Sequence, residues 1–172
     1  MKPPSRVAVF TSMVAGQLAG LTMAMTMMGT LALVYGRSPL FPLQVMSALL
    51  LGDSVLTNPT PGALAVGFLA HQTGPTLFWS RLLGFMVGYS KAPIDRTKAL
   101  LFGLLVGTVA QVIDIYVVMG PSQQARNGHN IWAENVRFPW DWVGHLVFGL
   151  SMGLFYLWLQ PREPQAGGDA GS

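Results

Sequence analysis

The sequence contains no cysteine and very little charge: of its 172 residues, only 10% are Asp, Glu, Lys or Arg. A soluble domain carries charge on roughly a quarter of its residues, so this composition indicates that lipid surrounds most of the surface. The lack of cysteine excludes disulfides, cysteine-ligated metals and thiol catalysis. The sequence also lacks C-x-x-C-H, H-E-x-x-H, a nucleotide-binding loop and a serine-hydrolase elbow. It therefore gives no support to an enzyme.

What the sequence does have is apolar residues. Hydrophobic residues make up 51% of the chain, and the mean hydropathy is +0.45. The net charge is +3, but the basic residues are too few and too scattered to form a surface that follows a nucleic-acid backbone. The expected surroundings are therefore membrane lipids, and nucleic acid is excluded as a partner.

Four apolar runs have the length of a membrane-spanning helix, which needs about 20 residues. They cover residues 7–34, 62–89, 99–119 and 142–159. The second run contains Gly74-Pro75, where we expect the helix to kink or unwind. The first run follows basic residues as a signal peptide does, but it is about twice as long as a signal peptide's apolar region. We expect it to be a retained helix.

These runs predict an all-α, polytopic membrane protein with one transmembrane domain over residues 1–160. Residues 40–51 are apolar but too short to cross, so they predict a re-entrant or interfacial helix. Residues 120–140 read as a polar loop, and residues 161–172 as a disordered C-terminal tail.

Basic residues near the ends of the runs predict the orientation, because cytoplasmic loops carry an excess of Lys and Arg. Six lie on the side of the two termini and three on the opposite side. We therefore expect an inner (plasma) membrane, with the N and C termini cytoplasmic. The six are Lys2, Arg6, Lys91, Arg96, Lys98 and Arg162; the three are Arg37, Arg126 and Arg137.

Small residues recur at four-residue spacing in three of the runs, which permits close approach of helices in lipid. Such faces serve either a dimerisation seam or packing within one chain, and packing within the chain is the favoured interpretation. The residues are Gly16 and Gly20, Gly103 and Gly107, and Gly149 and Gly153. Methionines in the first run could suggest copper, but they point in several directions around a helix, so core or lipid-facing positions are favoured. They are Met23, Met25, Met27 and Met28.

Three ionisable residues fall within the runs: His71, Asp114 and His145. Such residues are costly in lipid and are candidate functional groups. At about 1.5 Å per residue, all three lie roughly 6–14 Å from the outer surface. We therefore expect them to meet in the outer half of the membrane.

Several chemistries suit this group. His71 and His145 could hold a b-type haem, and together with Asp114 they could bind a divalent metal. A proton or small-solute path is a third option. The favoured interpretation is a buried hydrogen-bonded cluster that fixes how the helices pack.

The loop between the last two runs carries further polar and aromatic residues, namely His129, Glu134, Asp141, Trp132 and Trp140. They could cap the site or contact a partner. A polar loop anchored at the membrane surface by tryptophan is the favoured interpretation.

Three segments carry a resemblance to a known group. They are the glycine- and methionine-rich stretch 16–27, the stretch 41–52 that begins Phe-Pro-Leu-Gln-Val-Met, and Gly67-Phe-Leu-Ala-His71. Over roughly the first half of the chain their order resembles that in small bacterial inner-membrane proteins of the YagU-like kind. The resemblance implies a four-helix membrane protein and no defined activity.

The sequence as a whole predicts a non-catalytic membrane protein, either an accessory subunit of a larger complex or a homo-oligomer. The alternatives are a haem- or metal-binding redox subunit using His71 and His145, and a proton or small-solute path.

Overall fold

The computed structural model describes residues 5–90 and 92–160, and all regular structure within them is helical. This confirms the all-α prediction. The predicted C-terminal tail lies outside the described residues. The helices are α1 (Arg6–Tyr35), α2 (Phe41–Leu51), α3 (Ser54–Thr57), α4 (Pro61–Thr73), α5 (Pro75–Tyr89), α6 (Arg96–Ala110), the π-helix η1 (Gln111–Met119), α7 (Gly120–Asn127), α8 (Ile131–Asn135) and α9 (Trp140–Leu159).

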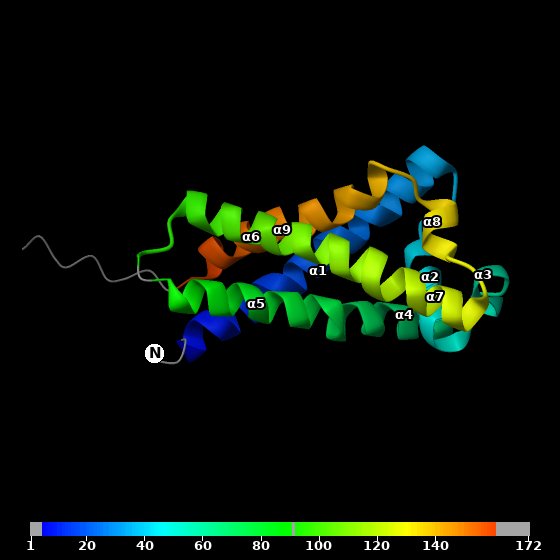
Figure 1. The fold of residues 1–172 in the computed structure, drawn as a ribbon, viewed down its shortest axis with the longest axis horizontal. Helices are drawn as coiled ribbons and strands as arrows, with labels where there is room; N and C mark the ends of the chain where they lie inside the picture. The colour runs from blue at the N-terminus through cyan, green and yellow to red at the C-terminus, as the bar shows by residue number, and fades with distance from the viewer. Residues whose placement is uncertain (1–4, 91, 161–172) are drawn as a thin grey trace, which may run out of the picture.

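The long helices lie side by side along the longest axis of the molecule (Figure 1). α1 begins, α5 ends, α6 begins and α9 ends at one end of the bundle, here named the N-terminal end. The short helices α2, α3, α7 and α8 gather at the opposite end, named the cap end. Within the described residues, three helices are long and apolar enough to cross a membrane: α1, the continuous helix of α6, η1 and α7, and α9.

The predicted run 62–89 forms two helices, α4 and α5, rather than one. Thr60 starts α4 by accepting a hydrogen bond from the Ala63 N–H. The break falls at Gly74-Pro75 as expected, because Pro75 has no N–H to donate to the His71 carbonyl four residues earlier. Neither half alone is long enough to span a bilayer.

Residues 40–51 form α2 at the cap end, where it packs against α4. The contact is close because Gly67 has no side chain: a Cβ there would overlap the Leu43 carbonyl oxygen and meet the Ser47 hydroxyl. The Ser47 hydroxyl donates to the Ala63 carbonyl. The predicted short helix is therefore present, held against the cap-end half of the α4–α5 pair.

The expected polar loop over residues 120–140 is wrong in part. Its first residues form α7, which continues from η1, and residues 131–135 form α8. The Gly120 N–H donates to the Ile115 carbonyl five residues back. The next residue, Pro121, has no N–H to donate within this continuous helix. The buried Gln123 side chain accepts a hydrogen bond from the Trp132 N–H and so ties α7 to α8.

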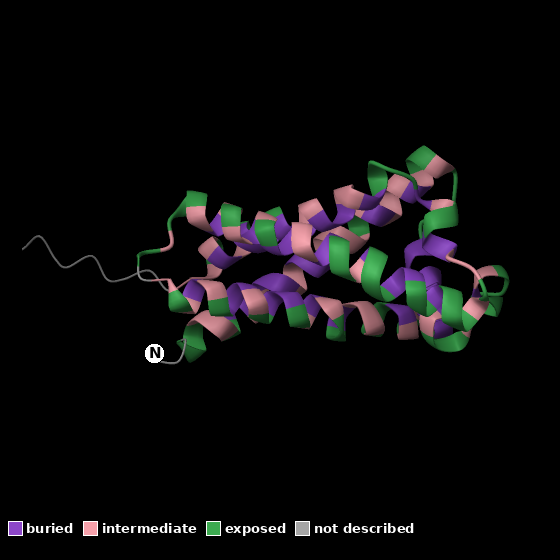
Figure 2. Ribbon diagram, in the orientation of Figure 1, coloured by how far each residue is buried: buried purple, intermediate pink, exposed green. Residues whose placement is uncertain are grey.

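Many large apolar side chains lie on the outside, while several serine, threonine and glutamine side chains are buried beside an apolar core. Figure 2 shows the buried residues along the helices. Leu33 is 89% exposed and Phe10 68% exposed, whereas Ser12 and Ser80 are fully buried. A soluble protein of this size would place these groups the other way round. The pattern suits a bundle whose outer surface faces lipid.

Glycines bring the long helices into backbone contact near the N-terminal end. A Cβ on Gly103 would overlap the Gly149 carbonyl oxygen, and a Cβ on Gly107 would overlap that of His145. Where α1 packs against α5, a Cβ on Gly16 would overlap the Ser80 side chain. Gly20 and Gly153 make similar contacts with α4–α5 and α6. These small-residue faces are thus occupied within the chain.

Candidate ligand site

Between the cap end and the glycine contacts, the helices line a cavity of about 80 Å³. One water needs roughly 10–15 Å³ of such space, so a few waters or one compact ligand would fit. Its apolar wall includes four methionines and three aromatic residues. These are Met23 and Met27 of α1, Met46 of α2, Met119 of η1, Trp79 of α5, Trp132 of α8 and Phe148 of α9.

The structure brings His71, Asp114 and His145 to this one cavity, from three different helices. The Nε2 atom of His145 lies 3.6 Å from the Oδ2 atom of Asp114. The same carboxylate oxygen accepts a 2.7 Å hydrogen bond from the indole N–H of Trp79. Asp114 is therefore fixed by groups from α5 and α9, and it stands within ion-pair reach of an imidazole.

His71 belongs to a second polar group beside the break between α4 and α5. Its Nδ1 atom lies 3.1 Å from the side-chain oxygen of Gln72. Gln72 in turn exchanges hydrogen bonds with Gln17 of α1, which donates to the Gln72 carbonyl. A Cβ on Gly20 would come within 2.5 Å of the Gln72 side-chain oxygen. Gly20 therefore makes room for this link between α1 and α4.

The sequence predicts Asp141 in the outer loop, but the structure buries it in α9, next to residues of the site. It lies in the first turn of α9 and is 7% exposed. Its Oδ2 atom accepts hydrogen bonds from Gln111 and from the Tyr116 hydroxyl, at 3.3 and 2.9 Å. Asp141 precedes His145 by four residues, so the two share a face of α9.

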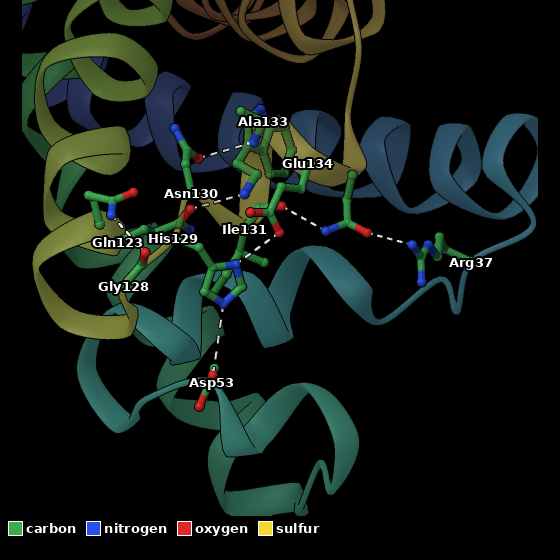
Figure 3. Close-up of polar contacts among 12 residues, drawn as sticks. Arg37, Asp53, Gln123, Gly128, His129, Asn130, Ile131, Ala133 and Glu134 are labelled. Carbon is green, nitrogen blue, oxygen red and sulfur yellow. Dashed lines mark hydrogen bonds and ion pairs between the residues drawn. The ribbon is translucent and has the colours of Figure 1, made fainter.

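His129 and Glu134 of the same predicted loop lie on the surface of the cap end (Figure 3). The Nδ1 atom of His129 is 2.8 Å from Glu134, and its Nε2 atom is 3.8 Å from Asp53, in the connection between α2 and α3. Arg37 reaches the neighbouring Asn135 side chain at 2.6 Å. These contacts hold α8, and with it the cavity residue Trp132, against the ends of α1 and α2.

Among residues 5–90 and 92–160, no three His, Cys, Asp or Glu side chains stand close enough to share a metal ion. The haem at His71 and His145, and the divalent metal at all three residues, stay predictions.

Comparisons of the chain with protein-family models, curated proteins and solved structures give no match. The resemblance to YagU-like proteins therefore stays a prediction. The residues that line the cavity therefore have to indicate its chemistry.

An apolar cavity with a few convergent polar groups is the usual form of a small-molecule site. Here the wall is mostly apolar, while Asp114 offers a carboxylate and the two histidines offer nitrogen atoms. Toward the N-terminal end, the glycine contacts bring the backbones of α6 and α9 together. The arrangement suits a binding pocket bordered on that side by closely packed helices.

Proposed function

We propose that this chain is an integral membrane protein that binds a small ligand in its cavity, reached from the outer side of the bacterial inner membrane. It crosses four times, as α1, the α4–α5 pair, the α6–η1–α7 helix and α9, with both termini cytoplasmic. The support for the fourth crossing is length: α4 and α5 together cover residues 61–89, and they run the length of the bundle in two pieces (Figure 1).

One observation carries the ligand-binding proposal: three ionisable side chains from three helices line a single, mostly apolar cavity. Ionisable groups inside a membrane bundle are costly, and where they occur they mark substrate or ion sites. A cluster that only fixed the helix packing would have no need of a space beside it. The cavity therefore favours the small-solute alternative over a purely structural role.

The accessory-subunit or homo-oligomer hypothesis stays a prediction. It rested on the small-residue faces, the small soluble mass and the lack of a catalytic motif, and glycines of all three faces pack against other helices of the same chain. A partner or a second copy would therefore have to bind a surface other than these glycine faces.

Native mass spectrometry of the protein extracted from its own membrane tests the proposal. We expect a co-purifying small ligand in the wild type, and its loss in Ala24→Phe, which adds a ring to the cavity wall. Leu105→Phe is the matched control, because Leu105 is 52% exposed on α6 and is not part of the cavity. Identical bound species in the wild type and Ala24→Phe, or none in either, would overturn the proposal.

A further inference from the structure

The four methionines of the cavity come from three helices, and two of them meet at one point of α9. A Cβ on Gly144 would lie 2.9 Å from the Met27 sulfur and 3.4 Å from the Met23 methyl group. Gly144 immediately precedes His145, so its missing side chain lets two thioethers reach the backbone beside that imidazole. Met25, between them in sequence, is 71% exposed and points away.

His145 has the arrangement of a metal-binding histidine. Its Nε2 atom faces the Asp114 carboxylate at 3.6 Å, which favours the proton on that nitrogen. Its Nδ1 atom is buried and has no hydrogen-bond partner, and the residue is only 6% exposed. Histidines that ligate a metal commonly hold their other ring nitrogen against a carboxylate, which fixes the tautomer and the ring orientation.

From these observations we infer that the cavity binds a monovalent soft metal ion, Cu(I), through His145 Nδ1 and thioethers of the methionines that line the same cavity. Thioether sulfur selects Cu(I) over the harder divalent metals. The thioethers are neutral, so the single carboxylate of Asp114 balances the single charge of the ion. The inference rests on the proposed function because it names the ligand class of the same cavity.

The methionines alone would not carry this conclusion, because methionine also fills irregular gaps in apolar cores. The difference lies in the open volume beside them and in the unpartnered nitrogen of His145. A gap that methionine had filled would be closed. An unpartnered buried nitrogen, in turn, costs free energy unless something binds it.

The test loads purified full-length protein with Cu(I) under reducing conditions, and with Ag(I) as its redox-inert analogue. Affinity is measured by competition with a chelator. We expect one ion per chain, with sulfur and nitrogen neighbours in the X-ray absorption spectrum. Met27→Leu with Met119→Leu should lower the affinity by at least about 100-fold, and Asp114→Asn by about 10–100-fold.

Met25→Leu is the matched control, since it makes the same change outside the cavity and should leave the affinity unaltered. Leucine for methionine nearly conserves volume, so the variants should fold; Met23→Leu serves alone if the double variant does not. No binding in the wild type, or equal losses in the Met25 and Met27 variants, would overturn the inference. If an organic ligand co-purifies and Cu(I) does not bind, copper is overturned as the ligand, but the proposed binding role of the cavity stands.

Discussion

The continuous helix of α6 and η1 meets α9 in different ways toward its two ends. Toward the N-terminal end, Gly103 and Gly149 bring the backbones into contact. Toward the cap end, the helices meet through side chains, as Gln111 bonds Asp141 and Asp114 stands beside His145. The same pair of helices is thus tightly closed at one end and borders a cavity at the other.

The difference shows that small residues and polar residues have different roles in a bundle surrounded by lipid. No hydrophobic force drives helices together in lipid, so close backbone packing at glycine supplies much of the association. Polar side chains of moderate length hold the helices apart, and each needs a partner because no water is at hand. The packed half would therefore set stability, and the cavity half would carry the function.

The largest expected effect comes from breaking the packed half. Gly149→Ala places a Cβ against the Gly103 carbonyl oxygen, with no flexible side chain to yield. We expect it to lower the free energy of unfolding by about 3 kcal/mol, the upper range for overpacking. Gly29→Ala is the control, because nothing lies within 4 Å of its added Cβ. It should raise stability by roughly 0.5–1 kcal/mol, since alanine favours a helix more than glycine does.

Unfolding by a denaturing detergent, followed by circular dichroism, measures both changes. If both glycine variants shift stability by the same amount, the contact between α6 and α9 does not hold the packed half together.

A smaller effect is expected in the cavity half, from the hydrogen bond between the Trp79 indole and Asp114. A double-mutant cycle of Trp79→Phe and Asp114→Ala should give a coupling of about 1 kcal/mol, within the range for polar contacts between membrane helices. Trp158, 73% exposed at the far end of α9, supplies the control. Its coupling to Asp114 should stay below about 0.5 kcal/mol. Equal couplings would show that Trp79 does not hold the carboxylate.

Much of the fold could be predicted because hydrophobic run length and proline act locally. The limits of α1 and the break at Gly74-Pro75 follow from the length of the apolar runs and from the missing N–H of Pro75. The helix α7 could not be predicted in this way. Its residues are polar, and it is held by a contact distant in sequence, between Gln123 and the Trp132 N–H.

The sequence predicts how deep in the membrane the site residues lie, but not how each helix is rotated about its own axis. Counting the rise per residue brought His71, Asp114 and His145 to one level, and all three line the cavity. Which residues face one another depends on how each helix is turned about its axis, and the π-helix η1 changes that turn around Asp114. The contact with Trp79 and the burial of Asp141 therefore left little trace in the sequence.

Thiol labelling tests the contrast between the two halves most directly, because the chain has no cysteine of its own. Thr76 lines the cavity and Ser12 lies in the packed half, and both are buried at 2% and 0% exposure. In intact cells, a small membrane-impermeant thiol reagent added from outside should label Thr76→Cys and leave Ser12→Cys unlabelled. A buried Thr76→Cys that resists the reagent as fully as Ser12→Cys would contradict a cavity reached from the outer side.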